Sequence, residues 1–97
     1  MVSEYVRRVG EMTKKELFKA VRKNWKEEGI SLDQAIYYSI PDSDAAYDAV
    51  YAMIPKAWLK RNDEDISSFL KEYGDDYGRW AVTLWIYEKM GAAYTTL

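Results

Sequence analysis

Four basic side chains recur along the chain at the spacing of one helix face. Lys15, Lys19, Arg22 and Lys26 stand at i, i+4, i+7 and i+11, so a helix would place them in a single row. Such a row can contact successive phosphates of a nucleic acid or an acidic protein surface. The alternative is an ordinary solvated face, and the sequence leaves both open.

A second candidate surface combines aromatic and acidic side chains. If a helix over residues 43–54 continued past the next proline, Tyr47, Tyr51 and Trp58 would share a face, with Asp44 and Asp48 nearby. Tyrosine and tryptophan offer large contact areas at low entropic cost. We therefore expect this surface to dock a protein partner or a second copy of the chain. The alternative is that neighbouring helices cover it.

Residue types exclude several chemistries. The chain has no histidine and no cysteine, which removes thiol nucleophiles, imidazole bases and the usual zinc sites. The acidic runs 63–65 and 75–76 lack the ligand spacing of a calcium loop and are expected to cap helices. No nucleotide-binding glycine loop is evident. We expect no enzyme activity, cofactor, metal or small-molecule substrate.

Composition indicates one soluble globular domain over residues 1–97. About half of the residues are apolar, a third are charged and 15 are aromatic, while the net charge is only −2. The charge is uneven: residues 1–28 hold eight basic and five acidic side chains, and residues 29–97 hold six and eleven. A molecule with such an uneven distribution of charge favours a charged partner or head-to-tail self-association.

Capping residues, apolar periodicity and breakers predict an all-α bundle of about five short helices. N-cap residues followed by apolar positions three and four apart indicate each start, and glycine or proline indicates each end. Pro55 is expected either to end the third helix or to kink it before one more turn through Trp58 and Leu59. The expected helices span about 13–28, 31–40, 43–54, 62–73 and 75–90.

The C-terminal helix is expected at the centre of the bundle. Residues 80–87 contain seven apolar residues in eight, and their β-branched and aromatic content would also suit a strand. A helix is favoured because a lone strand would have no partner elsewhere in the chain. A helix that is apolar almost all round belongs at the centre of the bundle or at a dimer seam.

The N-terminal residues 1–12 are expected to form a short helix or a loose arm. Arg7 and Arg8 lie there and would add phosphate contacts under the nucleic-acid hypothesis. No apolar run is long enough to span a membrane, and the start does not resemble a signal peptide. We therefore expect a cytoplasmic protein that does not bind membranes.

Two helices joined by a short turn over residues 14–40 resemble a helix-turn-helix. The second helix offers Asp33, Gln34, Tyr37 and Tyr38, a poor set of donors for base edges and phosphates. Residues 29–58, with their turn and cap residues, also resemble a helical module that follows the catalytic domain of some plasmid and viral primases. That resemblance covers about a third of the chain and implies a role beside replication machinery.

These observations support two hypotheses of different kinds. The first is a small protein-interaction or regulatory module that docks a partner through the aromatic and acidic helix face. The second is an accessory nucleic-acid-binding protein that contacts phosphates through the basic first helix.

Overall fold

The computed structural model describes residues 13–92 and confirms an all-α, single-domain bundle. Within that range the chain forms five helices and no strand. The helices are α2 (Lys14–Lys26), α3 (Leu32–Ser39), α4 (Asp44–Tyr51), α5 (Lys56–Tyr73) and α6 (Tyr77–Lys89). The predicted N-terminal arm, residues 1–12, lies outside the described residues.

Side-chain caps explain where four of the helices begin. Thr13, Ser31 and Ser43 each accept a hydrogen bond from the backbone N–H three residues later. The Asp76 carboxylate accepts from the N–H groups of Gly78 and Arg79. Each cap satisfies donors that have no partner inside the helix. The caps expected from the sequence at Thr13 and Ser31 are therefore confirmed. The sequence left Asp42 or Ser43 and Asp75 or Asp76 open for the other two helices, and the second residue of each pair is the cap.

The fourth expected helix begins six residues earlier than predicted. Pro55 is the N-cap of α5, and the helix runs without interruption from Lys56. Asn62 is not a cap: its side-chain amide donates to the carbonyl oxygen of Trp58, one turn earlier. The acidic run 63–65 consequently lies inside a helix, so the prediction that it caps a helix is wrong. A proline fits the N-terminal boundary of a helix because the first N–H groups have no internal partners.

Residues 52–55 form a turn, so the third helix ends at Tyr51 and not at Ile54. The α2 helix also stops earlier than expected, and residues 27–31 connect it to α3. Gly29 in this connection has φ +68°, a left-handed conformation that glycine adopts at little cost. The α2 and α3 helices pack closely, and the Asn24 amide donates to the Ser39 hydroxyl across their contact.

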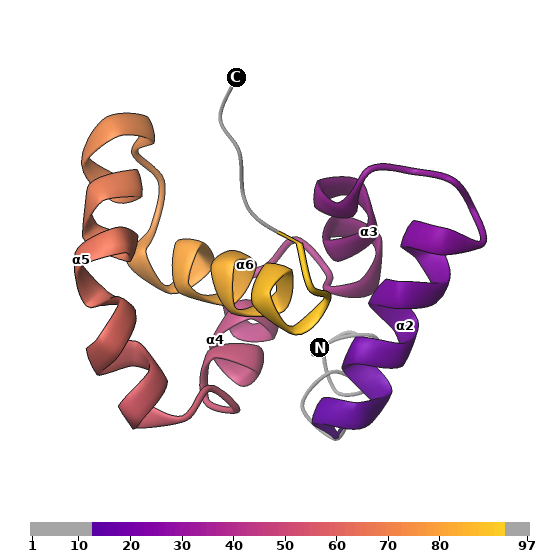
Figure 1. The fold of residues 1–97 in the computed structure, drawn as a ribbon, viewed down its shortest axis with the longest axis horizontal. Coiled ribbons are helices and arrows are strands. Elements are labelled where there is room, and N and C mark those ends of the chain that lie inside the picture. The colour runs from indigo at the N-terminus through magenta and orange to yellow at the C-terminus, as the bar shows by residue number, and fades with distance from the viewer. Residues whose placement is uncertain (1–12, 93–97) are drawn as a thin grey trace.

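The α6 helix occupies the centre of the bundle, as predicted. It lies between α5 on one side and the α2–α3 pair on the other, with α4 packed against it (Figure 1). Its residues Ala81, Val82, Trp85 and Ile86 are buried. The alternative of a strand over residues 80–87 is therefore wrong, since helical neighbours bury this segment without a sheet.

The core is apolar and joins all five helices. Fully buried side chains include Leu17 and Val21 of α2, Val50 of α4 and Ile66 of α5. The Phe18 and Trp85 rings pack edge to face, with centroids 5.1 Å apart, an arrangement that aromatic pairs prefer. The indole N–H of Trp85 has no acceptor among the described residues.

Polar bonds from aromatic side chains to carboxylates tie α6 to its neighbours. The Tyr77 hydroxyl donates to Asp63 of α5 at 2.6 Å. The Tyr87 hydroxyl donates to Asp33 of α3 at 2.7 Å. Two acids that look free in the sequence are thus occupied by contacts inside the molecule.

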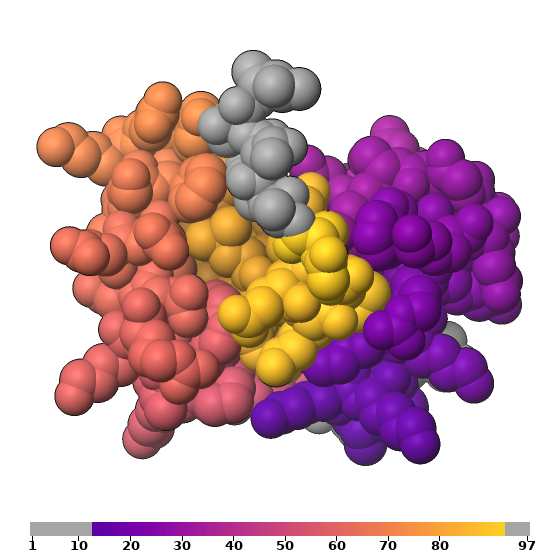
Figure 2. Space-filling view, in the orientation of Figure 1, coloured from indigo at the N-terminus to yellow at the C-terminus, as the bar shows by residue number. Residues whose placement is uncertain are grey.

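The central helix also reaches the surface. In Figure 2 the orange-to-yellow atoms of α6 are visible between α5 and the α2–α3 pair, and Leu84, Tyr87 and Met90 are half-buried. Among the described helices, none combines the length and apolar character needed to cross a membrane.

Candidate functional site: a basic face and an acidic face

The α2 helix presents an exposed basic face. All four cations of the predicted row, Lys15, Lys19, Arg22 and Lys26, are exposed. The row lies away from the apolar stripe because Leu17 and the other core positions of α2 recur on a different helical face. The structure therefore brings the four predicted residues together.

Two further lysines enlarge this surface. Lys14 and Lys23 are also exposed on α2, so the helix carries six cations against one acid, Glu16. Within residues 13–92 none of these six cations forms an ion pair. We call the six side chains the α2 basic face. The row at i, i+4, i+7 and i+11 missed Lys23, which lies to one side of it, and Lys14, which lies at the start of α2 on the side that also carries Val21 and Trp25.

Two of these cations lie over indole rings. The Lys26 ammonium is 3.9 Å from the centroid of Trp25, and the Lys14 ammonium is 5.9 Å from that of Trp85. Attraction between a cation and the negative ring face favours such contacts. Trp25 is half-buried, so an aromatic surface is available directly beside the basic face.

Side chains near the C-terminal end of α2 surround an open depression of about 320 Å³. It is lined by Lys19, Arg22, Lys23, Lys26 and Glu27. The charged ends of long side chains remain hydrated while their methylene stems offer apolar contact. In Figure 2 the indigo side chains of α2 project from the lower right of the molecule.

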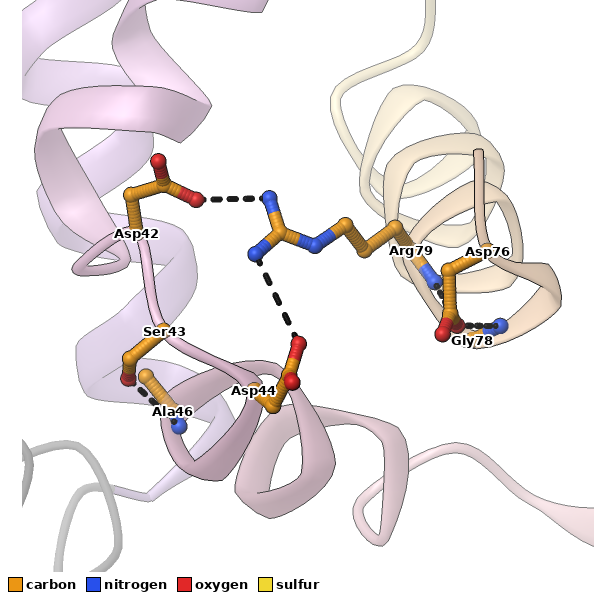
Figure 3. A network of polar contacts seen from close by, with 7 residues as sticks. All are labelled: Asp42, Ser43, Asp44, Ala46, Asp76, Gly78 and Arg79. Atoms are coloured by element: carbon orange, nitrogen blue, oxygen red, sulfur yellow. Dashed lines mark hydrogen bonds and ion pairs between the residues drawn. The ribbon is translucent and has the colours of Figure 1, made fainter. Parts of the chain in front are cut away.

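The acidic face of α4 consists of the acids at and near its start, Asp42, Asp44 and Asp48, and one arginine contacts two of them. Arg79, in the first turn of α6, forms an ion pair with Asp42 at 2.7 Å and a longer one with Asp44 at 3.8 Å (Figure 3). Its guanidinium also lies 4.4 Å from the ring centroid of Tyr47. These contacts fasten α6 to the start of α4 and occupy part of the predicted docking surface.

Burial and charge alter the titration of this cluster. Burial raises the pKa of the Tyr47 hydroxyl, with the Arg79 charge acting in the opposite direction. The hydrogen bond to Asp42 raises the pKa of Arg79 further above its usual range. Both groups therefore keep the protonation states that they ordinarily have at neutral pH.

Part of the acidic face remains open to solvent. The Asp44 side chain is 93% exposed, and Asp48 is also exposed. Together with Tyr47, Asp76, Gly78 and Arg79 they line a depression of about 200 Å³. Tyr51, the last residue of α4, is half-buried.

Trp58 does not belong to the predicted docking surface. Only 4% of it is exposed, and its indole nitrogen donates to Glu88 of α6 at 2.6 Å. The expected stripe of Tyr47, Tyr51 and Trp58 required one continuous helix, whereas α4 ends at Tyr51 and Trp58 belongs to α5.

Several exposed aromatic side chains lie outside both predicted surfaces. Tyr37 and Tyr38 of α3 are 56% and 57% exposed, and Tyr73 of α5 is 47% exposed. The core positions of α3 recur three and four residues apart, at Leu32, Ala35, Ile36 and Ser39, and leave both tyrosines on the opposite side of the helix. This periodicity is the signal that could have identified the first pair. Phe69 of α5 stacks on Trp80 of α6, with centroids 5.3 Å apart.

A further depression of about 230 Å³ lies between α5 and α6. Its lining includes Trp58, Phe69, Leu84 and Tyr87. No group of three or more candidate metal ligands occurs within residues 13–92. Arg7 and Arg8, named for the nucleic-acid hypothesis, lie outside the described residues.

The chain matches no protein-family description, and no curated protein or solved structure shows significant similarity to it. The similarity of residues 29–58 to primase modules therefore stays an expectation from sequence.

Proposed function

We propose that the protein is a binding module without catalytic activity whose α2 basic face contacts the phosphates of a nucleic acid. The observation that carries this proposal is the number of cations on α2 that form no ion pair within residues 13–92. The acids Asp33 and Asp63, in contrast, accept hydrogen bonds from tyrosines inside the molecule. An exposed, unpaired row of cations attracts a polyanion by releasing its condensed counterions.

The length of the row suits a short stretch of backbone. Lys15 and Lys26 are eleven residues apart, which corresponds to about 16 Å along a helix. One strand of duplex DNA carries a charge about every 3.4 Å of axis, so the row spans about five phosphates.

We do not expect the protein to recognise base sequence in a groove. The α3 helix exposes Asp33 and two tyrosines, and α4 exposes Asp44 and Asp48. Insertion of either helix into a groove would bring carboxylates towards phosphates. We therefore expect binding that depends strongly on salt and weakly on sequence.

The test is fluorescence anisotropy of labelled oligonucleotides of random sequence. With about four phosphate contacts, raising salt from about 50 to about 200 mM should weaken binding about 50- to 150-fold. The double substitution Lys19→Glu, Lys26→Glu should abolish binding at the lower salt. The matched control, Lys60→Glu with Lys71→Glu, changes the net charge equally on exposed positions of α5 and should weaken binding far less. Absence of binding at low salt, or equal weakening by both variants, would reject the proposal.

A second candidate function is docking of a positively charged protein, including a second copy of the chain, on the acidic face of α4. The observation in its favour is the exposure of Asp44 and Asp48 on a face opposite in charge to α2. Complementary charges steer association and fix its orientation. In a second copy, the α2 basic face would supply the cations.

Charge exchange tests self-association directly. Sedimentation at low salt should show association of the unaltered chain, and neither Lys19→Glu, Lys26→Glu nor Asp44→Lys, Asp48→Lys should associate alone. A mixture of the two variants should associate again, because each would supply the charge that the other lacks. A chain that stays monomeric at low salt would reject the self-association form of this candidate.

A further inference from the structure

We infer that the nucleic acid bound by α2 is single-stranded and that one of its bases stacks on Trp25. This inference rests on the proposed function and deepens it. Trp25 lies beside the exposed cations Arg22 and Lys26, and its ring is the aromatic surface nearest to them along the helix.

The position of Lys26 indicates that one face of the Trp25 ring is accessible. Its ammonium lies 3.9 Å from the ring centroid, and Lys26 itself is exposed. An ammonium group without a carboxylate partner keeps its hydration, so water reaches the ring face that it covers. A flat base can replace the ammonium there, since every base has a π-face for stacking.

The Lys26 ammonium that a stacked base displaces can bind a phosphate instead. Lys26 belongs to the same row as Lys19 and Arg22, and a stacked base would bring its own phosphate to that row. The side chain that leaves the ring therefore gains a phosphate partner. The methylene stems around the adjacent depression of about 320 Å³ add apolar contact for the sugar and base.

Duplex DNA cannot make the same contact. Its bases are paired and stacked, and extruding one costs free energy, whereas a single strand presents its bases to aromatic side chains directly. A module of this kind should therefore bind a single strand more tightly than a duplex at the same salt.

The first experiment uses the unaltered protein. Oligothymidylate is compared with an abasic oligonucleotide of equal length, which has the same phosphates and no bases, and with a duplex. We expect the abasic strand and the duplex to bind about 5- to 150-fold more weakly than oligothymidylate, the range that corresponds to the loss of one base–aromatic stack. Equal affinity for oligothymidylate and the abasic strand would overturn the inference.

The second experiment tests the residue. Trp25→Leu should lower affinity for oligothymidylate by the same factor, while Trp25→Phe should retain most of it. The matched control Tyr73→Leu removes an exposed aromatic ring from α5 and should leave affinity unchanged. Circular dichroism checks that the variants fold. Affinity for the abasic strand should be the same for Trp25→Leu and the unaltered chain, since the phosphate contacts do not need the ring.

The two proposals fail in different ways. If no oligonucleotide binds at about 50 mM salt, phosphate binding and base stacking are both rejected. If salt-sensitive binding occurs but Trp25→Leu binds as the unaltered chain does, the stacking inference is rejected and phosphate binding stands.

Discussion

Trp58 and Glu88 join α5 to α6 through a hydrogen bond of 2.6 Å between the indole nitrogen and a carboxylate oxygen. The tryptophan is buried and the glutamate is exposed. The bond thus allows a buried indole to keep a polar partner at the edge of the core. Trp58 was predicted to contact a partner, but in the structure it joins two helices of the same chain.

Loss of this bond should destabilise the fold. We expect Glu88→Ala to lower the free energy of unfolding by about 1 kcal/mol, because the indole N–H loses a charged acceptor. Glu88→Gln should cost less, since an amide oxygen still accepts. Urea denaturation measures both. The control is Glu72→Ala, another exposed glutamate in the last turn of a helix; an equal loss there would show that the bond to Trp58 does not contribute.

Tyr77 should make stability depend on pH at the alkaline end. Burial and the hydrogen bond to Asp63 raise the pKa of Tyr77 from 10.0 to about 12. The unfolded chain would ionise this tyrosine first, so its contribution to stability is complete below pH 10 and is lost as the pH rises towards about 12. Tyrosinate absorbance should reveal late-titrating phenols, Tyr77 and Tyr47 among them. Of these two, Asp63→Asn should lower the pKa of Tyr77 alone. Late titration that persists in Asp63→Asn would assign the effect to burial alone.

The continuity of α5 can be tested with proline. If a helix began at Asn62, proline at position 63 would occupy its favoured first position. Because position 63 is inside α5, Asp63→Pro should instead cost about 3 kcal/mol or more. Thermal unfolding followed by circular dichroism provides the measurement. Asp63→Ala, which removes the bond to Tyr77 without altering the backbone, is the control and should cost much less.

Substitutions at the two adjacent aspartates before α6 should change the free energy of unfolding in opposite directions. Asp75 has φ +76°, a left-handed conformation that is unfavourable for residues with a side chain. Asp75→Gly should therefore raise the free energy of unfolding by about 0.5 kcal/mol. Asp76 caps α6, so Asp76→Ala should lower it by about 1 kcal/mol. Chemical denaturation of the two variants measures both changes. Equal destabilisation by the two substitutions would contradict the roles assigned to Asp75 and Asp76.

The local signals of the chain were sufficient for most helix starts and for the fold class. Thr13, Ser31, Ser43 and Asp76 cap helices because a cap involves only backbone groups two or three residues away. The basic row of α2 was predictable for the same reason: a helical period decides which side chains share a face. The apolar segment 80–87 indicated the central helix because the rest of the bundle supplies apolar faces to cover it.

Longer-range contacts decided what these signals left open. Asn62 and the acids after it resemble a helix start, yet packing of α5 against α6 favours one continuous helix from Lys56. Tyr51 and Trp58 have the spacing of a shared face, but the turn at 52–55 separates them and Glu88 binds the indole from a helix 30 residues away. Pairing between distant residues also determined which charges are free. Arg79 pairs with Asp42, whereas within residues 13–92 the lysines of α2 form no ion pair, because the three-dimensional arrangement brings described acids to Arg79 and to none of those lysines.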